Sequence, residues 1–298
     1  MKKILVTGSG GIGGVNFVRA LKLFTDKFFI VGTDFNKYYL QFANLDEKVI
    51  SPKHSDPNFI TFLNELIEKY KIDFLHPQPS SEALVISKNF DQIKTDTLLP
   101  PSNVISTDKL ETQKILSKLN ILVAKTKVIK NYDMIENEFN DLGSGPHWIR
   151  AKSGAGGNLS LLCNNSKEVE YWMKLWILRG KANFNDFMLQ EYLPGRNIAW
   201  DSFWYNGKLI LSFTRERLEY PFKHISPSGI TGTPTVSKII VEESVNKIGE
   251  IAVKSIHEKP HGNYAVDLKE DVDGNWHVTE IDSGKFHTTT PLWGYIST

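Results

Sequence analysis

Residues 148–157 combine two cations with a run of small residues, which suits the binding of a polyphosphate. Two apolar residues lead into Arg150, Lys152 follows two positions later, and three glycines come next: Gly154, Gly156 and Gly157. Cations neutralise phosphate charge, and glycine amides approach phosphate oxygens without a Cβ in the way. The spacing differs from the Gly-x-x-x-x-Gly-Lys-Ser/Thr phosphate loop. An ordinary hairpin is the alternative interpretation of the same residues.

Three carboxylates near the end of the chain form a second candidate for chemistry. Asp267 lies on an expected strand over 264–270, and Glu280 and Asp282 lie two apart on an expected strand over 276–282. Residues two apart on a strand point to the same face, and a turn near residues 273–274 would bring Asp267 opposite them. Oxygen ligands without Cys or His suit Mg²⁺, with Mn²⁺ as a substitute. The alternative is a solvated edge strand.

A glycine-rich turn between Thr7 and Gly14 raises the possibility of a dinucleotide site. Gly8, Gly11 and Gly14 fit a phosphate-binding turn between strand and helix, and Asp34 falls where a ribose-binding acid would stand. This resembles the extended short-chain dehydrogenases and sugar epimerases, whose chemistry needs a Tyr with a Lys four residues on. None of the ten tyrosines has Lys at that spacing. An NAD(P)-binding epimerase or reductase is therefore the weakest function considered, and a turn that packs strand against helix is favoured.

The elements that must position these residues begin with alternating strands and helices. The expected strands are 4–6, 28–33 and 74–76, and the expected helices are 13–24, 58–70 and 82–89. This alternation predicts an α/β fold with a parallel, Rossmann-like sheet in residues 1–104. A helix opening around Asp108, capped by Ser106 or Thr107, then leads into mostly antiparallel strands over 105–298.

Composition excludes several classes of protein. The chain has 298 residues and a formal charge of +1, which argues against nucleic acid or an anionic membrane as a partner. The apolar segments are too short for a signal peptide or a membrane span. Cys163 is the single cysteine, so an intramolecular disulfide is impossible, and a reducing, cytoplasmic location is expected.

Five segments, taken in order, resemble the ATP-grasp superfamily, in particular the carbamoyl-phosphate-synthase-like and carboxylate–amine ligase branch. They are Gly8–Gly14, Asp108-Lys109, Arg150–Gly157, Gln190–Gly195 and Glu280-Ile281-Asp282. The resemblance covers nearly the whole chain. It implies a Rossmann-like pre-ATP-grasp domain over 1–104 and an ATP-grasp domain over 105–298. Within the latter, a lid subdomain spans about 122–188 and a nucleotide and metal subdomain about 189–298, and the two clamp the nucleotide.

The resemblance also implies roles for individual residues. The ATP-binding set is Lys109, Arg150, Lys152, Gly154, Gly156, Gly157, Gln190, Glu191, Tyr192, Leu193 and Asn197. Asp267, Glu280 and Asp282 correspond to the magnesium ligands.

Three departures from the family pattern stand out. Asn197 replaces a Glu that contacts the ribose, and Asp282 replaces an Asn ligand of the metal. The catalytic Arg of the Glu-x-Asn-Pro-Arg segment is missing, and Lys285 could supply its charge. Only 16 residues follow Asp282, so the C-terminal subdomain of longer members is expected to be absent or minimal.

The implied reaction is ATP-dependent activation of a small-molecule carboxylate as an acyl phosphate, followed by attack of an amine or similar nucleophile. Arg215 and Arg217, two apart on one strand face, are candidates to hold the transferring phosphoryl group or the acceptor carboxylate, together with Lys285 as a catalytic cation. For the Arg pair, a solvated face paired with Glu216 or Glu219 is the alternative. A catalytically weakened, nucleotide-binding regulatory protein is the alternative function, with Lys285 as the discriminating residue. A homodimer is compatible with the family.

Overall fold

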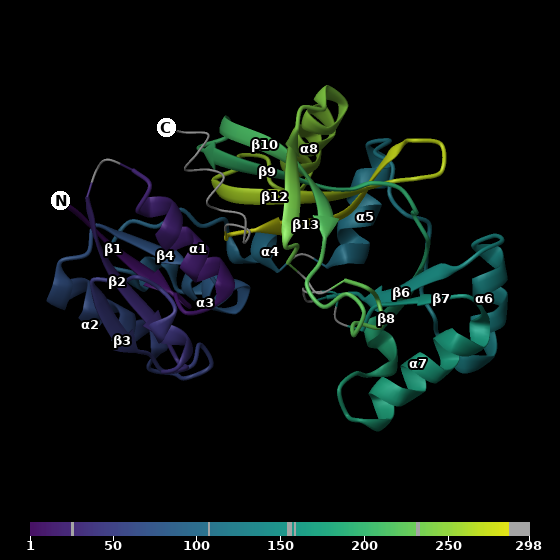
Figure 1. The fold of residues 1–298 in the computed structure, drawn as a ribbon, viewed down its shortest axis with the longest axis horizontal. Coiled ribbons are helices and arrows are strands. Elements are labelled where there is room, and N and C mark those ends of the chain that lie inside the picture. Colours follow the sequence, from purple (N-terminus) through teal and green to yellow (C-terminus); the bar gives the residue numbers. More distant parts are fainter. Residues whose placement is uncertain (25–26, 107, 154–156, 158, 231–232, 286–298) are drawn as a thin grey trace.

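The computed structural model describes residues 1–24, 27–106, 108–153, 157, 159–230 and 233–285. Its strands form three sheets, which Figure 1 shows at the left, the upper centre and the lower right. We call them the front sheet (order β3-β2-β1-β4), the large sheet (β11-β10-β9-β12-β13) and the small sheet (β5-β8-β6-β7).

The elements have the following bounds. The strands are β1 (Lys2–Thr7), β2 (Phe28–Asp34), β3 (Glu47–Ile50), β4 (Phe74–Pro77), β5 (Thr126–Lys127), β6 (His147–Ala151), β7 (Leu161–Cys163), β8 (Phe187–Glu191), β9 (Asn197–Tyr205), β10 (Lys208–Glu219), β11 (Val236–Ile240), β12 (Gly262–Glu270) and β13 (Trp276–Ser283). The α-helices are α1 (Ile12–Leu21), α2 (Phe59–Tyr70), α3 (Ser80–Lys88), α4 (Ser102–Ile105), α5 (Lys109–Lys118), α6 (Ile135–Asp141), α7 (Ser166–Leu178) and α8 (Glu243–Ile256). Short 3₁₀ turns are η1 (Tyr39–Gln41), η2 (Phe90–Gln92), η3 (Tyr132–Met134) and η4 (Phe184–Asp186).

The front sheet is parallel and covered on both faces, so the expected α/β class is confirmed. Successive residues of a strand point to opposite faces. Ile4 and Val6 of β1 therefore pack with Phe17 of α1, whereas Leu5 packs with residues of α2 and α3 such as Leu63. Because parallel strands end at the same edge, the turns after β1 and β4 lie side by side at that edge.

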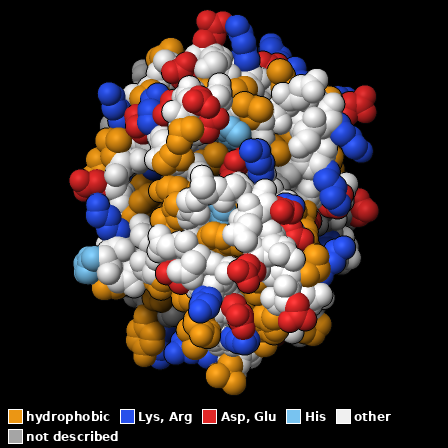
Figure 2. All heavy atoms as spheres, turned by 90° about the vertical axis from the view of Figure 1, so that its right-hand side faces the viewer, with side chains coloured by type: hydrophobic (Ala, Val, Ile, Leu, Met, Phe, Trp, Pro, Cys, Tyr) orange, Lys and Arg blue, Asp and Glu red, His pale blue; other side chains and the backbone are white. Residues whose placement is uncertain are grey.

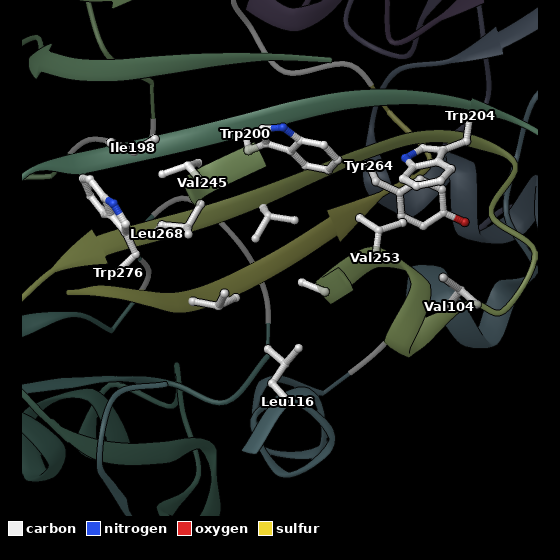
Figure 3. Close-up of a cluster of buried hydrophobic side chains, with 13 residues drawn as sticks. Val104, Leu116, Ile198, Trp200, Trp204, Val245, Val253, Tyr264, Leu268 and Trp276 are labelled. Atoms are coloured by element: carbon white, nitrogen blue, oxygen red, sulfur yellow. The ribbon is translucent and has the colours of Figure 1, made fainter. Parts of the chain in front are cut away.

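The large sheet is antiparallel and has one apolar and one polar face. Figure 3 shows Trp200, Trp204 and Tyr264 on the strands, with Val245 and Val253 of α8 among them. The intervening residues of the same strands carry the polar groups, so the period of two divides the sheet into a core face and a face free for chemistry.

The small sheet follows the same rule. The side chain of Ile149 in β6 is fully buried with Met173 of α7 and Phe187 of β8, whereas its neighbours Trp148 and Arg150 are less buried and point away from this core. The polar faces of the small and large sheets are the surfaces that the site uses.

Some elements differ from the sequence expectation. Helix α1 ends at Leu21 rather than at Phe24, and α8 and β3 were not anticipated. The cap of α5 is Asp108, whose carboxylate accepts from the amides of Leu110 and Glu111, so the expectation of Ser106 or Thr107 as cap is not met; Thr107 itself lies outside the described residues. The expected boundary at 104/105 falls within α4, and the one at 188/189 falls within β8.

The surface carries charges of both signs. On the face seen in Figure 2, Lys and Arg side chains alternate with Asp and Glu, in keeping with the formal charge of +1. Among the described helices, none is long and apolar enough to cross a membrane. Burial raises the pKa of the Cys163 thiol to about 12, which fits a structural thiol and not a nucleophile.

Candidate active site

One cavity of about 480 Å³ lies between the polar faces of the large and small sheets, with the turns of the front sheet at its side. Most residues that the sequence predicts for the site line it: Arg150, Gly157, Gln190, Glu191, Tyr192, Leu193, Asn197, Arg215, Arg217, Asp267, Glu280, Asp282 and Lys285. The glycines Gly8, Gly11 and Gly14 of the N-terminal turn line the same cavity. Residues more than 270 positions apart thus share one space.

Glu280 is the electrostatic centre of this site. Its Oε1 lies 2.9 Å from Nζ of Lys109, and its Oε2 accepts a 2.8 Å hydrogen bond from Nη2 of Arg150. Lys109 is almost buried, with 8% of its side chain exposed, so the pair is shielded from water. One carboxylate therefore pairs with both cations that the family resemblance assigns to ATP binding, and the trio keeps a net charge of +1.

The position of Glu280 follows from an irregularity in the hairpin of β12 and β13. Asp267 pairs with Glu280, but Leu268 pairs with Val278, so Thr279 is an extra residue in β13. A bulge of this kind re-aims the side chains beside it. Val278 stays in the core while Thr279 and Glu280 both reach the cavity.

Among the described residues, no group of three or more acidic, His or Cys side chains is placed to hold a metal ion. The expectation that Asp267, Glu280 and Asp282 converge as a ligand set is therefore not met in this arrangement. Two of them are paired with cations instead: Arg217 binds Asp267, and Lys109 and Arg150 bind Glu280. All three carboxylates nevertheless line the one cavity.

The two predicted arginines are interior, and the alternative of a solvated face is wrong. Arg217 donates to Oδ1 of Asp267 at 2.6 Å and to Oδ1 of Asn197 at 3.2 Å. Arg215 is 1% exposed and pairs with Asp201 at 2.9 Å. Burial disfavours the charge on Arg217, but the adjacent Asp267 outweighs it and raises the pKa of the guanidinium.

The end of β8 and the residues that follow it are held by contacts within the protein. The Gln190 side chain donates to Oγ1 of Thr126 at 2.8 Å, and Glu191 accepts from the amide of Lys125 at 2.7 Å. The carbonyl oxygen of Leu193 accepts from Nζ of Lys269 at 3.0 Å. These contacts fix the segment in the cavity wall.

Two of the predicted residues lie outside the cavity lining, and two cannot be placed. Lys109 reaches the site through Glu280. Lys152 contributes its backbone, since its carbonyl accepts from the amide of Lys109 at 3.3 Å. Gly154 and Gly156 lie outside the described residues.

The N-terminal glycine turn has a structural role. Gly8 has φ +57°, and a Cβ there would lie 2.1 Å from Cγ of Pro79. Asp34 is 4% exposed, and its carboxylate accepts from the amides of Gly10 and Asn36 at 3.2 and 2.8 Å. Asp34 binds the backbone of the turn, so its carboxylate is already used and does not serve the ribose contact that a dinucleotide site requires.

Comparison with known proteins shows similarity in structure only. No protein-family model matches the sequence, and no curated protein matches it. Among solved structures, the chain is similar to the biotin carboxylase domain of Hydrogenobacter thermophilus 2-oxoglutarate carboxylase, determined as a dimer with MgADP, ADP and bicarbonate (15% identity, TM-score 0.72, 97% of this chain and 65% of that one). It is also similar to Staphylococcus aureus N5-carboxyaminoimidazole synthetase complexed with ADP (16%, 0.67, 97% and 71%) and to Bacillus licheniformis L-amino acid ligase (13%, 0.67, 98% and 69%).

The chain has the ATP-grasp fold. It spans about two thirds of the length of these neighbours. The overall fold is thus shared at low sequence identity.

Several residues lining the site of this ATP-grasp fold escaped the sequence interpretation. Lys269 lies two positions after Asp267 on β12, so strand alternation alone would have placed it on the same face. It stacks on the Tyr192 ring, 5.2 Å from its centroid, and burial lowers the pKa of its ammonium group. Tyr220 accepts from Nδ2 of Asn197 at 3.0 Å, and no local pattern announces that contact.

The predicted phosphate loop meets a second loop, which contains Ile230, at the cavity. A Cβ at Gly157 would lie 3.6 Å from Cγ2 of Ile230, and Ile230 and Thr233 both line the cavity. Thr231 and Gly232 lie outside the described residues.

Proposed function

We propose that this protein is an ATP- and magnesium-dependent ligase that activates a small-molecule carboxylate as an acyl phosphate for attack by an amine or a similar nucleophile. The observation that carries the proposal is the cavity of about 480 Å³, whose lining joins the Gln190–Leu193 segment, the basic residues and the acidic hairpin. The ATP-grasp fold supports it, because the similar structures include a synthetase complexed with ADP.

The proposed division of labour follows the three sheets. The front sheet forms a Rossmann-like pre-ATP-grasp domain over 1–104, and the small sheet forms the lid over about 122–188. The Gln190–Leu193 segment holds the adenine edge, and Asn197, fixed by Arg217 and Tyr220, reaches the ribose with an amide in place of a carboxylate. Lys109, Arg150 and Lys152, with the Gly154–Gly157 loop, serve the phosphates.

The donor atoms of the acidic hairpin, formed by β12 and β13, are of the type that a hard divalent cation prefers. Asp267, Glu280 and Asp282 offer only carboxylate oxygens, the donors that Mg²⁺ prefers, and Mn²⁺ can substitute. These three carboxylates would hold such an ion, which would neutralise phosphate charge. Lys109 and Arg150 would exchange their ion pairs with Glu280 for contacts with phosphate oxygens, and the Glu280 carboxylate would become free to bind the cation.

The proposed chemistry needs positive charge around the transferring phosphoryl group. The bond between the γ-phosphorus and the ADP oxygen breaks, and a bond to the substrate carboxylate oxygen forms. The nucleophile nitrogen then bonds to the acyl carbon, phosphate leaves, and the amine protons pass to the phosphate and solvent. Arg215, Arg217 and Lys285 line the cavity and supply the cations. Lys285 faces the cavity, which favours catalysis over the regulatory alternative.

The test has two stages. Thermal unfolding is first measured with MgATP, MgADP, ATP plus chelator, and NADPH. A ligand at a hundredfold excess over its Kd stabilises by about 2.7 kcal/mol, which raises the Tm by several degrees. Stabilisation by MgATP that the chelator removes supports the proposal, whereas stabilisation by NADPH alone overturns it.

The second stage is ADP release from ATP with panels of acids and amines. The variants are Lys285→Ala, with Lys285→Arg as the conservative change and the exposed Lys130→Ala as the matched control. We expect a large loss of turnover in Lys285→Ala, partial activity in Lys285→Arg and none of this loss in the control. Nucleotide binding without ADP release for any pair would assign the protein to the regulatory alternative.

A further inference from the structure

Gln190 is held at the wall of the cavity of about 480 Å³ by a threonine on the neighbouring strand. Strands β5 and β8 are antiparallel, and Thr126 lies directly opposite Gln190, so both side chains point to the same face of the small sheet. Gln190 is 3% exposed, and its Nε2 donates to Oγ1 of Thr126 at 2.8 Å. Thr126 itself is not among the residues that line the cavity. It can therefore act on a ligand only through Gln190.

The other partners of Thr126 decide which end of the Gln190 amide faces it. A threonine hydroxyl has one hydrogen to donate and two lone pairs. Two acceptors are within reach of that hydrogen, the carbonyl oxygen of Ala124 at 2.9 Å and Oε1 of Gln113 at 2.8 Å. If the Gln113 amide turned over, its Nε2 would donate to Thr126, and the hydrogen would still go to the Ala124 carbonyl, which can only accept. In both arrangements Gln190 meets a lone pair of Thr126, so it must present its Nε2 there.

The opposite end of the amide is thereby fixed as an acceptor. No described residue donates to Oε1 of Gln190. A carboxylate has an oxygen at both ends, whereas an amide has one acceptor end and one donor end, so its orientation determines what it can bind. The apolar side chains that line the cavity include Ala124, Trp148, Tyr192 and Leu193. Such walls with one acceptor suit a flat ring that carries an N–H donor, and a ring with an oxygen at that place would leave Oε1 unpaired.

We infer that Thr126 is a positioning residue that sets the nucleobase preference of the site. It holds Gln190 with Oε1 as the free acceptor, to which a 6-amino purine can donate, whereas a 6-keto purine would place oxygen against oxygen. The inference rests on the proposed function for the place of the base beside Gln190. It goes beyond that function, because it assigns the preference to a residue that does not touch the ligand.

The experiment compares the Kd of MgADP with that of MgIDP by calorimetry of the full chain at pH 8. The two bases differ only at the edge in question, where hypoxanthine has a keto oxygen in place of the amino group and a hydrogen on N1. Thr126→Val keeps the shape of the side chain but removes the hydroxyl, so the Gln190 amide is free to turn over. Thr126→Ser keeps the hydroxyl. Gln190→Glu in the Thr126→Val background supplies an oxygen whichever way the side chain turns.

We expect the wild type to bind MgADP at least about tenfold more tightly than MgIDP. The ratio of the two Kd values should fall toward unity in Thr126→Val and return in Thr126→Ser and in the double variant. The matched control is Thr61→Val, at an exposed position of α2, which should keep the ratio of the wild type. A merely structural role of Thr126 would weaken both nucleotides equally, and an unchanged ratio in Thr126→Val overturns the inference.

Two further outcomes are distinguishable. Should Thr126→Val fail to fold, Thr126→Cys takes its place, because a thiol is only a weak donor and acceptor; its ratio should fall in part, and an unchanged ratio overturns the inference. Equal binding of MgADP and MgIDP by the wild type overturns this inference alone, since nucleotide binding is retained. If the wild type binds neither nucleotide, the proposed function fails and the inference fails with it.

Discussion

Glu82 is a buried acid whose protonation should make stability depend on pH. It lies in the first turn of α3 and is 4% exposed. Burial raises the pKa of its carboxyl to about 7, with Thr7 opposing the shift and the charge of Asp34 adding to it. The ordinary value is 4.5, so the folded chain holds this proton over a pH range where the unfolded chain has lost it.

The perturbation is Glu82→Gln, which is neutral at every pH. For the wild type, the contribution of Glu82 is fully present below pH 4.5 and is lost as the pH rises to about 7. The interval corresponds to about 3 kcal/mol at 1.36 kcal/mol for each pH unit. The free energy of unfolding of Glu82→Gln should therefore rise relative to that of the wild type by up to about 3 kcal/mol between pH 4 and pH 8.

The assay is urea unfolding of both proteins at half-unit steps of pH. Taking the difference between two proteins cancels other groups, including His76, whose pKa burial lowers to about 4. The exposed Glu65→Gln is the matched control and should give a difference that is flat with pH. A flat difference for Glu82→Gln as well, or one that falls with rising pH, would refute the reasoning.

Three further predictions concern the site and its supports. Glu280→Gln should abolish the part of the MgATP stabilisation that a chelator removes. Inorganic tripolyphosphate should bind this variant more tightly, because Lys109 loses its counter-ion. Calorimetry of both ligands checks this, and an unchanged effect of the chelator contradicts it. Asp108→Ala removes the cap of α5 and should lower the free energy of unfolding by about 1 kcal/mol in urea, a neutral result being evidence against the cap. Gly249→Ala places a Cβ 2.4 Å from the buried Trp200 ring. The overpacking should cost about 1–3 kcal/mol and lower the Tm, although alanine has the better helix propensity. A stabilised variant would show that the ring can move.

Strand periodicity explains why much of the candidate site was predictable. Arg215 and Arg217 lie two apart, as do Glu280 and Asp282, and a strand turns such pairs to one face whatever lies around them. The chemistry of residue types then marked that face as the polar one. The same reasoning would have found Lys269 beside Asp267 if it had been applied to the whole strand.

What escaped prediction depends on contacts distant in sequence or on small local preferences. Lys109 and Glu280 are 171 positions apart in the sequence, and no local pattern states that they will pair. The cap of α5 had three neighbouring candidates of similar propensity, and backbone geometry chose Asp108. Helix α8 did carry an apolar period, with Val245, Ala252 and Val253 on its buried side, but Gly249 interrupts it.

The backbone hydrogen bond from Lys109 to Lys152 fixes where a moving small sheet would pivot. Helix α5 is anchored by Leu116 in the core of the large sheet, and the bond ties the end of β6 to the first residue of that helix. In a rigid body that swings about a fixed point, displacement grows with distance from that point. Arg150 would therefore travel little while α7 swept a wide arc. If a nucleotide binds as proposed, its phosphates would lie near the pivot and would be held there while α7 was still turned away from the rest of the chain.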